Sequence, residues 1–400
     1  MLKGKTVVVG VTGGIAAYKS AQLVSDLVKL HCDVHVVMTK NALNFIHPIT
    51  FETLTGNKCL TDTFDRNFQF DVTHVSLSQK ADVFLVAPAS ADIIGKAANG
   101  IADDMLSTML LAATCKIIMA PAMNRYMYTN SIVQENLDKL RRYGFLIVEP
   151  VVGRLACADT GIGKLPDTEI LIESVTHEIA QKKDMNGLKV LVTAGPTVEA
   201  LDPVRYITNH STGKMGYAAA QAAFERGAEV TLISGPVSLR TPYGVHTVSV
   251  RSAEQMYQAV NDHINSYDIL IMSAAVADYT PDLVSDEKIK KKDGYLSVNM
   301  KRTKDILAYV GECKKEKQVV CGFSMETENL IENSRRKLTV KNCDLIAANS
   351  IRQSGAGFGT DTNIITLITA DETNALELMS KYDAANRILD KALKIYQSKT

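Results

Sequence analysis

The sequence lacks the features that mark several large classes of protein. Its apolar stretches fall short of the roughly 18 residues needed to cross a bilayer. The opening MLKGKTVVVGVTGG is interrupted by glycine too early for a secretion signal. Neither sign of charge is in excess, because 44 Lys and Arg residues are matched by 44 Asp and Glu residues. We therefore expect a cytoplasmic protein with neither a membrane nor a nucleic acid as partner.

Cysteine is scarce and scattered, and no two cysteines form a CxxC pair. This spacing argues against a zinc site and a disulfide framework, and it predicts reduced thiols. The seven cysteines are Cys32, Cys59, Cys115, Cys157, Cys313, Cys321 and Cys343.

The 400 residues are too many for one typical domain, and 46% hydrophobic with 22% charged residues is an ordinary globular composition. Short apolar runs alternate with helical segments in both halves, which predicts parallel strands covered by helices. A polar run, QKKDMNG, separates the halves near residue 182. We predict two doubly wound, open-sheet α/β domains, residues 1–182 and 186–400. The predicted strands are 6–11, 34–39, 82–88, 116–121 and 145–150, then 189–196, 229–236, 268–278, 318–324, 344–350 and 363–369.

A glycine-rich turn follows the first predicted strand and precedes a helical segment. Glycines there let backbone N–H groups approach a phosphate, and the start of a helix adds a favourable potential. The turn, VGVTGG at 9–14, departs from the GxGxxG fingerprint of dinucleotide-binding proteins. Phosphate binding is the favoured interpretation, and a plain tight turn is the alternative.

Two further strand ends carry small polar residues, in PASAD at 88–92 and PAMN at 121–124. Ser90 and Asn124 could bind a ligand at the carboxyl edge of the sheet or simply cap helices. His74, which we expect on a strand, and Cys157, in a glycine-rich segment suited to a flap, could join them. Taken singly, the histidine could be a structural residue and the cysteine could be inert packing.

Together these motifs resemble the homo-oligomeric flavin-containing cysteine decarboxylases, specifically phosphopantothenoylcysteine decarboxylase, over residues 1–180. The resemblance implies a flavodoxin-like fold, trimeric units and an FMN cofactor that serves as an electron sink while CO2 leaves. It also implies that His74 assists proton removal or substrate activation, Asn124 binds the substrate carboxylate, and Cys157 protonates the enethiolate. The implied FMN contacts are Thr12, where a serine is common, with Gly13, Gly14, Thr39, Pro88, Ser90 and Ser107.

The second half opens on a loop rich in glycine and hydroxyl residues that ends in STGKMG. A Walker A motif would need glycine at position 208 and serine or threonine at 215, where this chain has Thr208 and Met215, so we reject it. The loop could still bind an anion through its backbone amides.

A strand ending near Asp278 precedes the lysine-rich EKIKKK at 287–292, which we expect in an extended loop. Lys337 and Lys341 have the i, i+4 spacing of one helix face. These lysines could neutralise a nucleoside triphosphate, whereas the alternative is a solvated face.

The motifs TAGPT, NHSTGKMG, SAAVADY, EKIKK, GFSMET and AAN resemble phosphopantothenoylcysteine synthetase over residues 186–400. The resemblance implies a Rossmann-like, dimeric ligase that joins 4′-phosphopantothenate to L-cysteine using CTP and Mg²⁺ through an acyl-cytidylate. Asn209 would bind the acyl intermediate, and Lys288 would stabilise charge on its phosphate. The implied CTP contacts are Ser273, Ala274, Asp278, Lys288, Lys304 (where a proline is common), Asp305, Ile306, Leu307, Phe323, Lys337 and Lys341.

The sequence thus predicts a bifunctional enzyme of coenzyme A biosynthesis, a ligase and a decarboxylase in one chain. One alternative is a two-domain NAD(P)-dependent oxidoreductase, which the missing GxGxxG fingerprints disfavour. Another is a non-catalytic flavin-binding regulatory protein, which the presence of His74, Asn124 and Cys157 disfavours.

Overall fold

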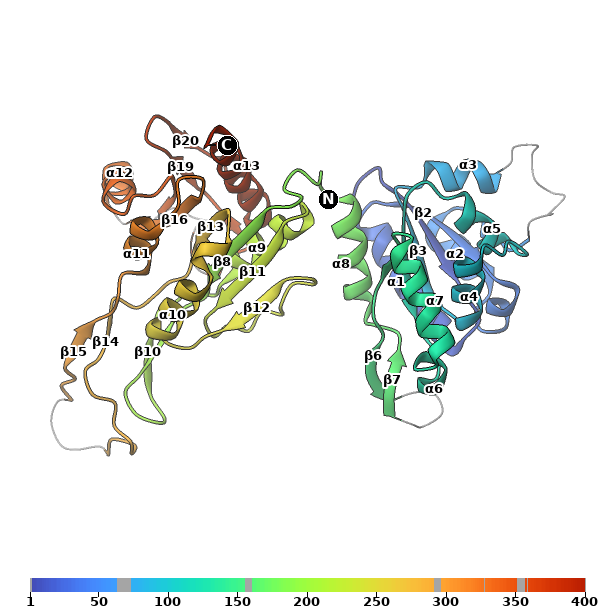
Figure 1. Cartoon of the computed structure of the whole chain (residues 1–400), viewed down its shortest axis with the longest axis horizontal. Coiled ribbons are helices and arrows are strands. Elements are labelled where there is room, and N and C mark those ends of the chain that lie inside the picture. Colours follow the sequence, from blue (N-terminus) through green and yellow to red (C-terminus); the bar gives the residue numbers. More distant parts are fainter. Residues whose placement is uncertain are drawn as a thin grey trace. The chain divides into compact units, whose positions relative to one another are not determined.

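The computed structural model describes residues 2–62, 73–154, 160–290, 296–326, 328–350, 357 and 359–399. The chain divides into two compact units, Met1–Gln181 and Lys182–Thr400 (Figure 1). Within the described residues, no helix combines the length and the apolarity that a bilayer crossing requires.

The first unit is built on a five-stranded sheet in which every pairing is parallel. The strand order is β2-β1-β3-β4-β5, so the chain reverses its direction of winding between β1 and β3. This is the flavodoxin-like order, and it confirms the predicted doubly wound sheet. The strands are β1 (Thr6–Val11), β2 (Asp33–Met38), β3 (Val83–Ala89), β4 (Lys116–Pro121) and β5 (Leu146–Ile147).

Helices cover both faces of this sheet because alternate residues of its strands point to opposite sides. Val7 and Val9 of β1 belong to one hydrophobic cluster and Val8 to the other. The first cluster packs against α1 and α8, and the second packs against α4, α5 and α7. The helices are η1 (Ile15–Ala17), α1 (Tyr18–Lys29), η2 (Lys40–Asn44), α2 (Pro48–Thr55), α3 (Thr73–Lys80), α4 (Ala91–Asn99), α5 (Met105–Ala112), α6 (Arg125–Tyr128), α7 (Ser131–Arg142) and α8 (Thr168–Ile179). A hairpin of β6 (Val151–Arg154) and β7 (Thr160–Lys164) precedes α8.

The prediction that His74 lies on a strand was wrong. The backbone of His74 belongs to helix α3, although THVSLS alternates apolar and polar residues as a strand would. Among residues 76–81, whose burial is described, Leu77, Ser78 and Ala81 are buried, and their spacing is that of one helix face. The packing of that face has overridden the local alternation.

The second unit has an eight-stranded sheet of order β12-β11-β8-β13-β16-β17-β19-β20. Its first six strands are parallel, and β19 and β20 are antiparallel additions at one edge. The strands are β8 (Lys189–Ala194), β11 (Glu229–Ser234), β12 (His246–Ser249), β13 (Ile269–Met272), β16 (Val319–Glu326), β17 (Leu345–Ser350), β19 (Thr366–Ile368) and β20 (Thr373–Ala375).

Helices again cover both faces, with α9 (Lys214–Glu225) and α13 (Lys381–Lys399) on one side. The other side holds α10 (Ala253–His263), η3 (Ile264–Ser266), α11 (Ile306–Cys313) and α12 (Leu330–Val340). Helix α9 lies close to the sheet because it is alanine-rich and carries Gly216, where an added Cβ would come within 2.5 Å of Ala194 Cβ. Short ribbons join β9 (Val198–Ala200) to β10 (Tyr206–Thr208), β14 (Tyr279–Pro281) to β15 (Met300–Arg302), and β18 (Thr362–Asn363) to β21 (Met379–Ser380).

The predicted strand at 268–278 is shorter in the structure, where β13 ends at Met272. The chain then turns, because the amide of Ala274 donates to Thr193 Oγ1 and that of Ala275 donates to the carbonyl of Gly195. Asp278 therefore lies in the connection between β13 and β14 and not on the sheet.

Candidate active sites

Four loops meet at the carboxyl edge of the first sheet, where open α/β sheets bind ligands. The glycine turn follows β1, Thr39 follows β2, Ser90 follows β3 and Asn124 follows β4. Neighbouring loops are joined by hydrogen bonds from Thr39 N to Val11 O (3.0 Å) and from Ala122 N to Ala89 O (3.1 Å). The structure therefore brings most of the residues predicted to bind FMN to one edge.

The Thr12 hydroxyl joins two of these loops. It donates to the carbonyl of Pro88 (2.7 Å) and accepts from the amide of Ser90 (3.0 Å), and Thr12 is almost fully buried. Its one proton is thus already used within the protein, so a phosphate here would be bound by backbone N–H groups instead. Gly13 is required for packing, since an added Cβ would lie 2.5 Å from Asn41 Cβ.

Three of the predicted polar residues take part in helix caps, an alternative that the sequence left open for Ser90 and Asn124. Ser90 accepts from Ile93 N (3.4 Å) at the start of α4, and Asn124 Oδ1 accepts from Tyr126 N (2.8 Å) at the start of α6. Ser107 forms a capping box with Asp104 at the start of α5. Capping places these residues at the positive ends of helices, where an anion is also stabilised.

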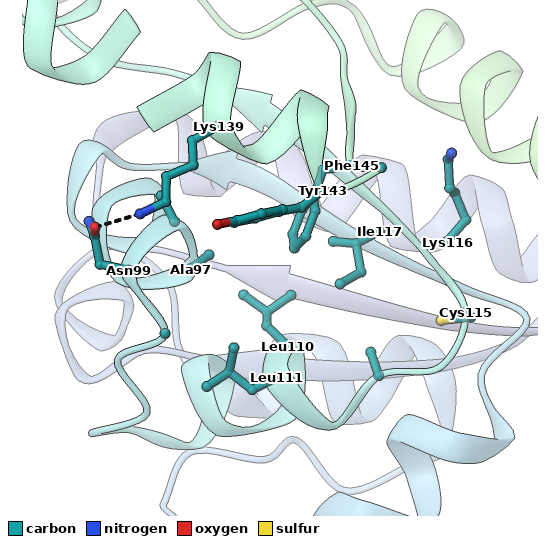
Figure 2. Close-up of a pocket in the computed structure, with 14 residues that line it drawn as sticks. Ala97, Asn99, Leu110, Leu111, Cys115, Lys116, Ile117, Lys139, Tyr143 and Phe145 are labelled. Carbon is teal, nitrogen blue, oxygen red and sulfur yellow. Dashed lines mark hydrogen bonds between the residues drawn. The ribbon is translucent and has the colours of Figure 1, made fainter. Parts of the chain in front are cut away.

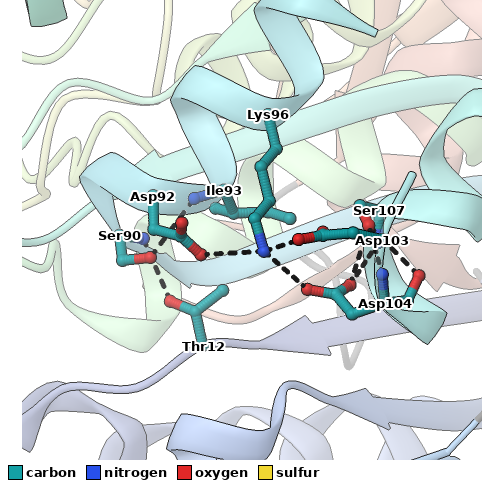
Figure 3. A network of polar contacts seen from close by, with 8 residues as sticks. All are labelled: Thr12, Ser90, Asp92, Ile93, Lys96, Asp103, Asp104 and Ser107. Carbon is teal, nitrogen blue, oxygen red and sulfur yellow. Dashed lines mark hydrogen bonds and ion pairs between the residues drawn. The ribbon is translucent and has the colours of Figure 1, made fainter. Parts of the chain in front are cut away.

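Lys96 links the starts of α4 and α5 (Figure 3). Its ammonium lies 2.9 Å from Asp103, 3.1 Å from Asp104 and 3.4 Å from Asp92. Hydrogen bonding to Asp103, with the neighbouring negative charges, raises the pKa of Lys96. One permanent cation therefore holds together the two helix starts that present Ser90 and Ser107.

Thr39 provides the test of whether this edge fits a flavin. Its side-chain oxygen is buried and has no hydrogen-bond partner in the described part of the chain. A buried hydroxyl without a partner is costly, and such groups are uncommon in native proteins. A polar ligand bound between the ends of β1 and β2 would supply the missing partner, so the residues present fit the predicted cofactor.

Replacing this hydroxyl should have opposite effects on stability and on binding. We expect Thr39→Val to leave the flavin-free protein as stable or more stable by up to about 1 kcal/mol, because it removes an unsatisfied polar group. The same change should weaken FMN binding about tenfold. Thermal unfolding of the flavin-free protein and a fluorescence titration with FMN measure the two effects.

Thr12→Val is the matched control for that prediction. Its hydroxyl has two partners, so this variant should lose about 1–3 kcal/mol of stability without added flavin. Wild-type FMN affinity in Thr39→Val would remove Thr39 from the cofactor site.

The β6–β7 hairpin packs against the loop of Asn124. The amide of Met123 donates to Gly163 O (3.0 Å), and Gly163 has a φ of +134° with no room for a Cβ, which would lie 2.2 Å from Met123 O. Cys157 lies between the two strands in sequence, outside the described residues, as does the side chain of His74. The carboxyl edge of the sheet, which holds Asn124, is thus also the place where the hairpin is anchored.

A cavity of about 550 Å³ in this unit lies elsewhere (Figure 2). It is lined by Lys116, the first residue of β4, and by the carboxyl ends of α4, α5 and α7. Lys139 crosses its rim and donates to Asn99 Oδ1 (3.1 Å). This is the amino edge of the sheet, and none of the described residues that line the cavity is a predicted flavin contact.

A second cavity, of about 600 Å³, lies at the carboxyl edge of the second sheet. It collects residues from the end of β8, the turn after β13, the start of α11, strand β16 and helix α12. Nine of the eleven predicted CTP contacts line it, namely Ala274, Asp278, Lys304, Asp305, Ile306, Leu307, Phe323, Lys337 and Lys341. Because these residues lie far apart in sequence, it is the fold that brings them together.

Basic side chains predominate in this cavity. Arg302, Lys304, Lys337 and Lys341 line it, against only two carboxylates. Lys337 donates to the carbonyl of Phe323 (2.8 Å), and Lys341 pairs with Asp305, the N-cap of α11. Although burial opposes it, the bond to Lys341 holds the pKa of Asp305 below its usual value. The positive excess suits an anionic nucleotide.

Lys304 occupies the position where the related motif often has a proline. Its ammonium contacts Glu254 (2.7 Å) and lies 4.2 Å from the centre of the Tyr257 ring. Asp305 still caps α11 by accepting from Ala308 N (2.9 Å). The loop start therefore keeps a helix cap without the proline, and the ammonium of Lys304 is engaged at the wall of the cavity.

Three predicted residues do not line this cavity. Ser273 donates to Thr193 O (2.6 Å), Asn209 Nδ2 donates to the carbonyls of Ala275 (2.9 Å) and Val276 (3.3 Å), and Lys288 is exposed in a loop. The loop assignment of Lys288 agrees with the sequence prediction. Several of the residues that line the cavity were not identified from the sequence, and Arg302 is the charged one among them. Nothing in its local sequence, MKR, distinguished Arg302 from an ordinary surface residue.

Comparison with known protein families identifies the class of protein to which the chain belongs. Residues 1–180 match the family described as Flavoprotein, and residues 185–396 match the DNA/pantothenate metabolism flavoprotein C-terminal domain. The two units thus define a flavoprotein of pantothenate metabolism.

Within that class, the chain belongs to the family of coenzyme A biosynthesis bifunctional proteins CoaBC. It is 46% identical to the member from Bacillus subtilis over 393 residues, which are 97% of each chain. It is 41% identical to that from Escherichia coli K12 over 401 residues, covering 100% of this chain and 99% of the relative. It is also similar to the crystal structure of the C-terminal domain of a CoaBC protein, at 41% identity and a TM-score of 0.47, covering 54% of this chain and 100% of that one.

Proposed function

We propose that the second unit ligates 4′-phosphopantothenate to L-cysteine at the expense of CTP, and that the first unit decarboxylates the product to 4′-phosphopantetheine. The observation that carries the proposal is the basic cavity at the carboxyl edge of the second sheet, which nine predicted nucleotide contacts line. Family membership supports the pairing of the two activities in one chain.

In the ligase reaction, the substrate carboxylate attacks the α-phosphorus of CTP and pyrophosphate leaves. The amine of cysteine then displaces CMP from the acyl-cytidylate and loses a proton. The triphosphate would be neutralised by the four basic groups that line the cavity, Arg302, Lys304, Lys337 and Lys341. Asn209 would bind the acyl intermediate, and Lys288 would meet the charge that develops on its phosphate.

A Mg²⁺ ion accompanying CTP would be held mainly by phosphate oxygens and water. No three His, Cys, Asp or Glu side chains of the described residues gather closely enough to hold a metal ion themselves. Asp278 and Asp305 are the carboxylates that line the cavity.

In the decarboxylase reaction, a bound FMN would supply a reversible two-electron acceptor for oxidation of the substrate thiol. Asn124, fixed by its cap to α6, would orient the substrate carboxylate by hydrogen bonding. His74 would assist proton removal, and Cys157, which lies between β6 and β7 in sequence, would return a proton to the enethiolate carbon. Thr39 and the backbone amides of Gly13 and Gly14 would hold the cofactor.

Two measurements on the purified chain test this function. The protein should bind FMN and be yellow, and it should release pyrophosphate from CTP only when 4′-phosphopantothenate is present. Reduction of NAD(P)⁺ in place of these activities would support the oxidoreductase alternative. Homo-oligomerisation into trimeric and dimeric units and a cytoplasmic location are further parts of the proposal.

The two activities should be separable, because the hydrophobic clusters of each unit draw on that unit's own residues. We expect fragment 1–181 to decarboxylate and fragment 182–400 to ligate. Fragment 186–400 should be less stable by several kcal/mol, since it lacks the fully buried Met185 and Asp184, which holds the buried Arg226 at 2.8 Å. Activity assays and thermal unfolding of the three fragments check this. Ligation that requires the first unit would contradict separability.

A further inference from the structure

The loop between β9 and β10 contains a buried carboxylate that the proposed mechanism does not use. The side chain of Asp202 has no exposed surface. Its Oδ1 accepts from the amides of Val204 (2.9 Å) and Arg205 (2.8 Å). Its Oδ2 accepts from Arg205 Nε (3.0 Å) and Nη2 (2.6 Å) and from the amide of Ile289 (3.1 Å).

Five N–H groups exceed the roughly four lone-pair positions of a carboxylate, so Asp202 has no remaining capacity to bind a substrate. The hydrogen bonds from Arg205 hold the pKa of Asp202 well below its usual range. Burial opposes this shift, and the bonds from the backbone amides add to it. The carboxylate is therefore ionised at every pH suitable for an assay, and its role must be exerted through the groups that it holds.

What Asp202 holds is the segment that carries Lys288. Arg205 Nη2, fixed by Asp202, also donates to the carbonyl of Ile289 (2.9 Å), and the amide of Ser285 donates to Leu201 O (3.0 Å). The 285–289 segment is thus attached to the loop at three points. One of them is the amide of the peptide bond that joins Lys288 to Ile289.

The same loop leads directly into the other candidate catalytic residue. Strand β10 ends at Thr208, and Asn209 follows it with its side chain bonded to the carbonyls of Ala275 and Val276. Thr208 Oγ1 donates to Thr197 O (2.7 Å), which fixes the end of that strand. The Asp202 loop therefore fixes the backbone of Lys288 relative to that of Asn209.

We propose that Asp202 is a positioning residue of the ligase site, whose carboxylate fixes the Lys288–Ile289 peptide relative to Asn209. The inference rests on the proposed role of Lys288. The side chain of Lys288 is exposed and makes no hydrogen bond or ion pair with the described residues, so the direction of its ammonium depends on where its backbone is held. Misplacing such a group by about 1 Å can lower a rate about 100-fold.

The test is a double-mutant cycle in the full chain. Asp202→Asn keeps the shape but puts an NH2 group where N–H donors converge. We expect it to slow single-turnover ligation at saturating substrates about 10- to 100-fold, with CTP affinity within twofold because residue 202 does not line the nucleotide cavity. In a Lys288→Ala background, the same change should cost less than threefold. Asp286→Asn, an exposed carboxylate in the held segment, is the matched control and should ligate normally.

A second variant keeps the test decisive if Asp202→Asn does not fold. Ile289→Pro removes the N–H donor on the held segment and leaves the Asp202–Arg205 pair in place. Because proline also fixes φ at 289 and restricts the backbone of Lys288, it should show at least the same loss, with the same non-additivity with Lys288→Ala. Wild-type rates in both variants, or losses that multiply fully with Lys288→Ala, would overturn the positioning role. A near-normal rate in Lys288→Ala alone would instead overturn the proposed function of Lys288, and with it the role of Asp202 that acts through it.

Discussion

Replacing Lys288 with alanine is expected to slow overall ligation about 100- to 1000-fold. A charge placed in advance against a developing oxyanion contributes several kcal/mol to the transition state, more than it contributes to binding of the ground state. The effect should therefore appear in kcat, with little change in the KM for CTP. Quenched-flow measurement of phosphopantothenoylcysteine formation separates the two.

Lys290 provides the control for this prediction. It lies two residues away on the same loop and is also exposed, so Lys290→Ala reports what the loss of a solvated lysine costs. We expect less than a twofold change, in line with the small effects of surface substitutions. Lys288→Arg should recover part of the rate, because it restores the charge with a different geometry. If Lys288→Ala and Lys290→Ala ligate equally well, the lysine run is a solvated face.

The second large effect is expected from Cys157→Ser. A serine hydroxyl is a far weaker acid than a thiol, whose usual pKa is about 8.5, so it cannot protonate the enethiolate at neutral pH. Oxidation of the substrate and loss of CO2 precede that step and should survive. The variant should therefore release CO2 and accumulate the oxidised enethiol without forming phosphopantetheine. A single-turnover absorbance trace of the flavin, with mass spectrometry of the product, makes the measurement.

The cysteines of this unit that the structure describes are poor candidates for the acid. Burial raises the pKa of Cys32 to about 11 and that of Cys59 to about 12, and it also raises the pKa of Cys115. Cys115 lies at the cavity on the amino edge of the sheet. Cys115→Ser should therefore turn over normally and serves as the control. Phosphopantetheine formed at the wild-type rate by Cys157→Ser would exclude Cys157 as the proton donor.

Much of the fold could be predicted because its central strands are apolar on both faces. Strands such as β1, with all six residues buried, leave a continuous hydrophobic run that few other structures produce. The prediction failed where tertiary contacts decide the outcome. The segment around His74 alternates like a strand but packs as a helix. Strand β13 ends early because the amides of Ala274 and Ala275 donate to Thr193 Oγ1 and Gly195 O.

The nucleotide site could be predicted mainly from motifs, and the fold explains why these motifs act together. Asp278, Phe323 and Lys337 are far apart in sequence, yet parallel strands bring their loops to one edge. Arg302 and Asp202 could not be assigned in this way. Arg302 reaches the cavity through the β14–β15 ribbon, and the contact of Asp202 with Ile289 spans 87 residues, so neither depends on a local pattern.

The Lys96 network has a consequence for how a mutational scan of this protein should be interpreted. One ammonium serves three aspartates, so loss of Asp92 or Asp103 leaves it two partners and should be tolerated. Loss of Lys96 leaves three neighbouring carboxylates without the ammonium that they share, and loss of Asp104 also removes the cap of α5. A scan would score Asp92 and Asp103 as tolerant of substitution and Lys96 and Asp104 as sensitive, although all four belong to one network of ion pairs.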